Sequence, residues 1–387
     1  MDVDEAVLRW QQILEGGLGL PATRGNRIDI LRNGDEIFPA MLDAIARAQH
    51  TVDMLTYVYW SGEIAERFAV ALCDRAKAGV RVRVLLDAIG AAVMSRELIN
   101  DMNEAGCHFE WYRPPTTWKV WEADHRTHRK VLVCDGKVGF TGGVGIAEEW
   151  QGDARNPDEW RDTHVRVEGP AVDGLRAAFV TNWRETDQPL FDERDKFFAH
   201  DQPGDALVQV LRCPAQIGWT DLHTMFGLLI DFAQESLNIT TAYFVPDEQI
   251  CDKLMAAARR GIDVTVLVPG RHADKRVVQL AGEKDYESLL AAGVKIFNYQ
   301  KTMLHAKVMT VDGAVATIGS GNLDQRSMRL NDECNVLLLD RALTAELDGH
   351  FREDLAASEQ IDPDRWQGRG VVQRTAEVAT DAIDHKL

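Results

Sequence analysis

Two segments of the sequence repeat one arrangement of residue types that could act together on a phosphate ester. Residues 128–135 and 305–312 both read His-x-Lys-x4-Asp, and a glycine follows each aspartate after six further residues. The residues between each lysine and its aspartate are mostly apolar, which favours a β-strand. Because residues i and i+2 of a strand point to the same face, each histidine should lie beside its lysine.

Cleavage of a phosphodiester is the chemistry that suits these residues. It needs a nucleophile, an acid for the leaving oxygen and positive charge around the non-bridging oxygens. A histidine with an ordinary pKa of about 6.5 can serve near neutrality as a neutral nucleophile or as an acid. We therefore expect His128 and His305 to be catalytic, with Lys130 and Lys307 supplying the charge that a metal supplies elsewhere. On this interpretation the site needs no metal and no cofactor.

A single His-x-Lys pair would more often be an ordinary surface strand than a site. The second copy changes this interpretation, because both copies belong to an internal repeat. Residues 51–87 and 237–269 each contain a β-rich run, a segment with helical spacing, a glycine and a second β-rich run, which predicts a β-α-β unit. Gly79 and Gly261 are 182 positions apart, and the two motifs are 177 positions apart. The chain therefore looks like a duplication.

The repeat predicts an α/β fold of two homologous α/β/α lobes. The expected division is an N-terminal helical segment (1–24), an N-terminal lobe (25–186), a linker (187–205), a C-terminal lobe (206–360) and a tail (361–387). Apolar residues of the N-terminal segment have helical spacing, so this helix could pack against the body or lie on a membrane.

Charge and cysteine spacing limit the classes of protein to consider. Of 387 residues, 43 are Lys or Arg and 61 are Asp or Glu; the formal charge of −18 argues against a nucleic-acid coat. The six cysteines are at least 27 positions apart, and His125 with His128 lacks a third ligand, so no metal is expected. The sequence shows no signal peptide and no apolar run of about 18 residues. These features predict a cytoplasmic protein with peripheral membrane association.

The paired motif resembles the signature of the phospholipase D superfamily, and further stretches are similar to its bacterial cardiolipin synthase branch. These stretches are residues 25–34, 160–169, 241–247 and 321–331. The resemblance implies the phospholipase D fold, with two lobes that share one active site at their interface. It also implies a phosphohistidine intermediate on His128, with His305 protonating the departing alcohol and then deprotonating the incoming one.

The same resemblance implies roles for residues around the phosphoryl group. Lys130, Lys307 and Asn322 would hold its oxygens, and Ser320 would line the same pocket. The first copy departs from the pattern at Gly145, where an asparagine is usual. This departure leaves the two halves of the phosphate cradle unequal.

Four acidic residues complete the set of candidates. Asp162 and Glu333 match carboxylates that orient the histidines, although both could be ordinary polar residues of strands. Asp135 and Asp312 belong to the motif and are included among the substrate-binding candidates, but support of a loop is the more natural role for them.

The first copy also carries an insertion of ten residues before its motif. Residues 111–121 contain three tryptophans, a tyrosine and two basic residues, which suits a bilayer interface or, equally, a packed loop. Residues 271–276 form a basic cluster that could meet anionic headgroups or be a solvated turn.

The predicted function is a cardiolipin synthase-like phosphatidyltransferase that condenses two phosphatidylglycerols to cardiolipin and glycerol. A phospholipase D that hydrolyses phospholipid to phosphatidic acid remains open, because no residue distinguishes a lipid hydroxyl from water as the acceptor. A nucleic-acid phosphodiesterase fits less well with the acidic charge and the aromatic insertion. The expected partners are phosphatidylglycerol and a membrane surface, and nucleic acid is not expected.

Overall fold

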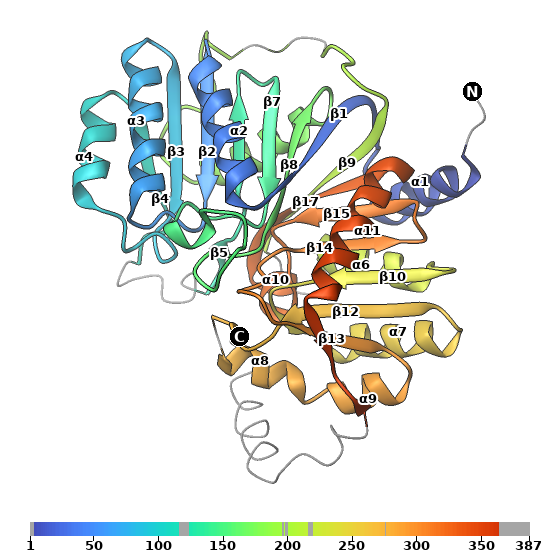
Figure 1. Ribbon diagram of the computed structural model, residues 1–387. Helices are drawn as coiled ribbons and strands as arrows, with labels where there is room; N and C mark the ends of the chain where they lie inside the picture. The colour runs from blue at the N-terminus through green and yellow to red at the C-terminus, as the bar shows by residue number, and fades with distance from the viewer. Residues whose placement is uncertain are drawn as a thin grey trace.

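The computed structural model describes residues 4–115, 124–195, 197, 200–215, 220–274 and 276–363, which fold around a long mixed sheet (Figure 1). In the N-terminal lobe the strands lie in the order β1 (Thr23–Arg32), β8 (Thr163–Glu168), β7 (Val138–Gly142), β6 (Val131–Cys134), β2 (Thr51–Thr56), β3 (Arg81–Asp87) and β4 (His108–Tyr112). In the C-terminal lobe the order is β9 (Ala206–Cys213), β17 (Asn331–Leu339), β15 (Val315–Gly319), β14 (Val308–Val311), β10 (Ser236–Thr240), β12 (Asp263–Pro269), β13 (Lys295–Tyr299) and β18 (Ser358–Gln360).

The two lobes repeat one topology. Strands β2, β3 and β4 are parallel neighbours, and so are β10, β12 and β13. The pairs that lead from β2 to β1, and from β10 to β9, are all antiparallel. β1 pairs with β9 and so joins the lobes into one sheet. This repeat confirms the expected fold of two homologous lobes, while the boundaries predicted along the chain stay predictions.

Helices cover both faces of the sheet, as strands buried on both sides require. In the N-terminal lobe these are α2 (Asn33–Arg47), α3 (Glu63–Lys77), α4 (Arg96–Glu104), α5 (Val172–Trp183) and a short 3₁₀ helix (Glu148–Trp150). In the C-terminal lobe they are α6 (Asp221–Asp231), α7 (Glu248–Arg259), α8 (Arg276–Glu283), α9 (Tyr286–Ala291), α10 (Gln325–Arg329) and α11 (Arg341–Ala356). The short strands β11 (Phe244–Val245) and β16 (Leu323–Asp324) pair with each other.

One hydrophobic core crosses the boundary between the lobes. It contains Val165 of β8 and Phe179 of α5 from the first lobe, together with Ile318 of β15 and Val336 of β17 from the second. Because protein interiors are close-packed, this shared core holds the two lobes in a fixed relation. The starts of β6 and β14, which directly follow the two His-Lys pairs, are therefore positioned by the whole sheet.

The N-terminal helix α1 (Glu5–Leu18) packs against the body of the protein. Its Trp10 and Leu14 are fully buried in the main core of the C-terminal lobe. Asp4 caps the helix by accepting hydrogen bonds from two backbone amides of the first turn. This packing favours the first of the two expected alternatives for the segment.

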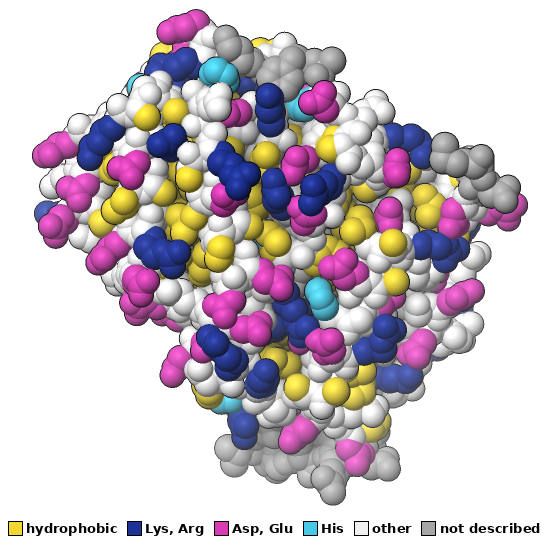
Figure 2. Space-filling view, turned by 45° about the horizontal axis from the view of Figure 1, so that its top comes forward, with side chains coloured by type: hydrophobic (Ala, Val, Ile, Leu, Met, Phe, Trp, Pro, Cys, Tyr) yellow, Lys and Arg dark blue, Asp and Glu magenta, His cyan; other side chains and the backbone are white. Residues whose placement is uncertain are grey.

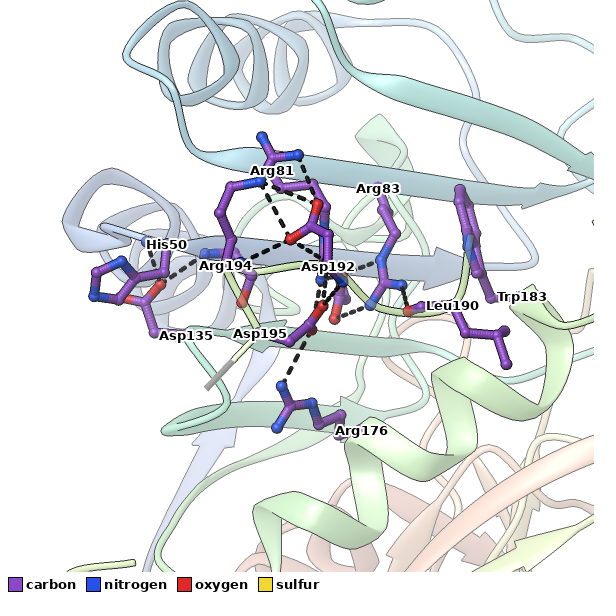
Figure 3. A network of polar contacts seen from close by, with 12 residues as sticks. His50, Arg81, Arg83, Asp135, Arg176, Trp183, Leu190, Asp192, Arg194 and Asp195 are labelled. Atoms are coloured by element: carbon purple, nitrogen blue, oxygen red, sulfur yellow. Dashed lines mark hydrogen bonds and ion pairs between the residues drawn. The ribbon is translucent and has the colours of Figure 1, made fainter. Parts of the chain in front are cut away.

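The segment that connects the lobes is fastened to the N-terminal lobe by buried ion pairs (Figure 3). Arg81 of β3 contacts Asp192 at 3.1 Å and donates a second hydrogen bond to Asp195 at 2.7 Å. Arg83, two residues along β3, donates to Asp53 at 2.7 Å and to the carbonyl oxygen of Leu190 at 2.5 Å. The part of the linker around residues 190–195 is thus ordered by side chains of one strand.

Candidate active site

Both motif histidines line one pocket between the lobes, together with the lysine of the first pair. His128 and Lys130 lie immediately before β6, and His305 and Lys307 lie immediately before β14. A pocket of about 140 Å³ is lined by both histidines and by Lys130. Its other lining residues are Tyr57, Val58, Trp60, Trp150, Trp160, Tyr243, Asp274, Val278, Asn322, Asp324, Arg326, Ser327 and Asn331.

Backbone hydrogen bonds pin each histidine to the opposite lobe. The strand β5 (Arg126–Thr127) pairs with the start of β17, and Figure 1 shows it where the two lobes meet. The amide of His128 then donates to the carbonyl oxygen of Asp332 at 2.9 Å. In the same way the amide of His305 donates to the carbonyl oxygen of Arg161 at 2.7 Å. Neither histidine depends on its own lobe alone for its position.

The two candidate orienting carboxylates also act across the interface. Glu333 of β17 lies 3.1 Å from Nδ1 of His128 through either of its oxygens. Asp162, just before β8, places Oδ2 2.8 Å from Nδ1 of His305. A carboxylate only accepts hydrogen bonds, so each Nδ1 carries the proton and each Nε2 is left with a lone pair. Spacing along the sequence relates each acid to the histidine of its own lobe, whereas the contacts are exchanged.

The two lysines lie against the histidine that precedes them. Lys130 Nζ donates to the carbonyl oxygen of His128 at 2.8 Å. Lys307 Nζ lies 3.0 Å from Nδ1 and 3.1 Å from Nε2 of His305, and it also contacts the carbonyl oxygen of that residue. All four side chains are nearly inaccessible to bulk water.

Burial is the main control on the protonation of these four side chains. It lowers the pKa of His128 and of His305 to about 4, even though each faces a carboxylate. Burial likewise lowers the pKa of Lys130 to about 7 and that of Lys307 to about 8. At neutral pH both histidines are therefore neutral, and one lysine is close to its midpoint. A neutral imidazole with a free Nε2 is the form that can attack phosphorus.

Known proteins are similar in sequence to this chain over most of its length. Residues 41–151 and 228–355 match the family described as "Cardiolipin synthase, PLD-like domain". The chain is 34% identical over 359 residues to a probable cardiolipin synthase of Bacillus subtilis, covering 92% of this chain and 71% of that protein. It is 31% identical to a cardiolipin synthase of Clostridium perfringens, covering 93% and 77%. The chain belongs to the cardiolipin synthase family of phospholipase D superfamily enzymes.

A solved structure shows the same fold at low sequence similarity. The phosphatidylserine synthase of Haemophilus influenzae superposes with a TM-score of 0.74 at 14% identity, covering 98% of this chain and all of that one. The phospholipase D fold expected from the paired motif is therefore present in this member of the cardiolipin synthase family.

Two of the substrate-binding candidates lie away from the pocket. The carboxylate of Asp135 accepts hydrogen bonds from the backbone amides of residues 49–51, before β2. Asp312 does the same for the amides of residues 234–236, before β10. Each follows a four-residue strand and lies five residues beyond its motif lysine, which corresponds to roughly 16 Å of extended chain. These contacts favour the loop-supporting role over substrate binding for both aspartates.

Ser320 also differs from its expected place. It is fully buried, and its hydroxyl contacts Glu333 and accepts from the amide of Cys334 at 3.0 Å. It does not line the pocket among the residues described, so it supports a carboxylate rather than substrate. Asn322 does line the pocket, and its buried Oδ1 has no hydrogen-bond partner within the described part of the chain. An unpaired amide oxygen there is available to a ligand.

The glycines of the first copy are explained by close packing. A Cβ at Gly145 would lie 2.6 Å from Cβ of Val58, so the asparagine usual at this position has no room. A Cβ at Gly143, which matches Ser320, would lie 2.2 Å from Oδ1 of Asp162. The asymmetry between the halves of the pocket is therefore built into the backbone packing.

An aromatic wall beside His305 was not anticipated from the sequence. The rings of Trp150 and Trp160 lie 5.1 and 5.6 Å from the His305 ring, and that of Tyr243 lies 6.4 Å away. Tyr57 stands edge-on to His128 at 5.2 Å. The two tryptophans follow the glycine-rich turn after β7. The absence of polar side chains in that turn was the sequence feature that could have indicated an apolar wall.

Only the first part of the aromatic insertion lies within the described residues. Trp111 and Tyr112 belong to β4, and the Tyr112 hydroxyl is buried where it donates to Asp332 at 2.8 Å. Residues 116–123, with Trp118 and Trp121, lie outside the described residues. In the basic cluster at 271–276, Lys275 and the side chain of Arg276 lie outside them as well.

Proposed function

We propose that this protein is a phosphatidyltransferase that condenses two phosphatidylglycerols to cardiolipin and glycerol. The observation that carries the proposal is the convergence on one pocket of the two motif histidines, each beside a carboxylate from the other lobe. Relatives that cover most of the chain and bear the name cardiolipin synthase support the choice of substrate.

In the first half-reaction Nε2 of His128 attacks phosphorus, and the bond from phosphorus to the glycerol oxygen breaks as the P–N bond forms. Glu333 accepts the Nδ1 proton of His128 in a hydrogen bond and stabilises the positive charge that develops on the ring. His305 gives its proton to the departing glycerol oxygen. An incoming phosphate anion raises the pKa of His305, so that the acid form is populated once substrate is bound.

The second half-reaction reverses these roles. His305 removes the proton from the hydroxyl of a second phosphatidylglycerol, whose oxygen attacks phosphorus and releases His128. Lys130, Lys307 and the side-chain amide N–H of Asn322 donate to the non-bridging oxygens through both steps. Water in place of the lipid hydroxyl would give phosphatidic acid, which is the hydrolytic outcome.

The substrate is met at a membrane surface in this proposal. A pocket of about 140 Å³ is smaller than the roughly 300–1,000 Å³ typical for drug-sized ligands, so it admits a headgroup and not acyl chains. None of the helices within the described ranges is long and apolar enough to cross a bilayer. Basic and acidic side chains alternate over the face shown in Figure 2, which suits local contacts better than a broad attraction to polyanions.

Incubation with phosphatidylglycerol vesicles, without added metal, tests the proposal by mass spectrometry of the products. We expect cardiolipin and glycerol in equal amounts, and His128→Ala should reduce product formation by at least about 10³-fold. The matched control is His50→Ala, which removes an exposed histidine of the same lobe and should leave the rate unchanged. Phosphatidic acid without cardiolipin would instead establish a hydrolase, and full activity of His128→Ala would exclude both.

A further inference from the structure

The carboxylate that orients His305 receives a second hydrogen bond on the same oxygen. Asp162 Oδ2 lies 2.8 Å from Nδ1 of His305 and accepts from Nε1 of Trp150 at 2.9 Å. Trp150 ends the 3₁₀ helix after β7, and only 2% of it is exposed. Its ring also stands edge-on to the His305 ring at 5.1 Å. One side chain therefore contacts both members of the pair.

In the other lobe, a different residue donates a hydrogen bond to the orienting carboxylate. There the hydroxyl of Ser320 donates to Glu333, the partner of His128. Its counterpart Gly143 has no side chain, and the carboxylate of Asp162 occupies the space that a side chain would need. The indole N–H of Trp150 thus takes the place that a serine hydroxyl has in the second copy.

The two carboxylates accept different sets of hydrogen bonds. Asp162 accepts from Trp150, from His305 and, through Oδ1, from the amide of Thr163 at 2.8 Å. Among described residues Glu333 accepts only from His128 and Ser320. Each hydrogen bond stabilises the charged carboxylate, so the donor that each lobe supplies affects how strongly its carboxylate attracts the proton of the histidine beside it.

The two lysines also act on both histidines, at different distances. Lys307 lies 3.0 Å from His305 and repels a proton on that ring, and Lys130 acts on it from farther away. Lys130 and Lys307 also repel a proton on His128, but neither touches its ring nitrogens. A histidine that holds its proton weakly is the better acid, whereas one with stronger support for positive charge is the better nucleophile.

We propose that Trp150 is a positioning residue that fixes Asp162 beside His305 and adjusts His305 as the proton donor, while Ser320 does the same for Glu333 and the nucleophile. The proposal rests on the transferase function above, in which His305 protonates the leaving alcohol. It also explains why the two copies differ, because the histidine of one motif acts as the nucleophile and the histidine of the other acts as the proton donor.

Trp150→Phe isolates the hydrogen bond, because it keeps an aromatic ring and removes the N–H. Without that donor Asp162 becomes more basic and stabilises protonated His305, so the alkaline limb of the kcat–pH profile should move up by about 0.5–1 pH unit. The value of kcat should fall by about tenfold, because the acid is weaker. Ser320→Ala should instead move the acidic limb upward, since His128 must be neutral to attack.

Two further measurements keep the test decisive. Trp150→Gln retains an N–H donor but no ring, and it should keep the alkaline limb within about 0.2 pH unit of the wild-type position if the hydrogen bond is what matters. An NMR titration of His305 in the His128→Ala background needs no turnover, so it tests the proposal even if the transferase function fails. Trp150→Phe should raise the pKa of His305 there. Loss of kcat with both limbs and this pKa unmoved would show that Trp150 only packs, and would overturn the proposal.

Discussion

At the scale of single residues, burial governs the charge of the groups in and beside the pocket. It lowers the pKa of both histidines to about 4 and that of Lys130 to about 7, so near neutrality the histidines are neutral and Lys130 is close to its midpoint. Four carboxylates lie in or beside the pocket, and burial raises the pKa of one of them, Asp324, to about 7. We therefore expect these groups to take up protons when an anionic substrate binds.

This state predicts that binding of an anion takes up protons. A soluble phosphodiester, glycerophosphoglycerol, should raise the pKa values of Lys130 and the histidines and so bind with net proton uptake at pH 7. Isothermal titration calorimetry in two buffers of different ionisation enthalpy measures the number of protons. Net release, or identical apparent enthalpies in both buffers, would contradict it. Lys130→Met should reduce the uptake.

Some of these residues could be predicted from the sequence, and others could not. The repeated spacing predicted both His-Lys pairs, and the resemblance supplied Asp162 and Glu333 as partners. The exchange of carboxylates between lobes could not be predicted, because spacing along one lobe carries no information about contacts across an interface. Trp150 was missed for the same reason, since its role depends on the space left by Gly143.

At the scale of elements, the motif aspartates and the linker show how strands are held in register. Asp135 and Asp312 each occupy the left-handed region with φ of 54° and close the turn after a motif strand. Each turn has the Asp-Gly sequence that is typical of a turn after an apolar strand, which agrees with the loop-supporting role expected for the two aspartates. The attachment of the linker to β3 was not predictable, since it joins residues more than 100 positions apart.

Asp195→Asn tests that attachment. Although burial alone would raise it, hydrogen bonding to Arg81 lowers the pKa of Asp195, so the pair stabilises the fold above the ordinary aspartate pKa and loses this contribution as pH falls. The substitution should lower the free energy of unfolding at pH 7 by about 2 kcal/mol, and by less near pH 3. Urea denaturation at both pH values measures it.

The control for this prediction is Asp43→Asn. Its ion pair with Arg47 is exposed on α2, so the free energy of unfolding should change by less than about 0.5 kcal/mol. Equal effects of the two substitutions would mean that the linker contacts contribute no more than a surface pair does.

At the scale of the whole molecule, duplication builds one site from two half-sites. Each lobe supplies one histidine, one lysine and the carboxylate that the other lobe needs, so neither half is complete without its partner. The shared core and the β1–β9 pair keep the halves together. The sequence repeat predicted this architecture directly, because a fold that recurs in one chain leaves the same pattern twice.

The proposed reaction at a membrane surface has a consequence for the kinetics. If the small pocket takes a headgroup while the acyl chains stay in the bilayer, both reactants are confined to a plane, and encounter depends on how densely they populate it. Diluting phosphatidylglycerol with a neutral phospholipid at constant bulk concentration should lower the rate, and cardiolipin formation should fall more steeply than hydrolysis, because it uses two lipids from the same surface. The rate would then depend on the mole fraction of phosphatidylglycerol in the membrane surface, and not on its bulk molar concentration.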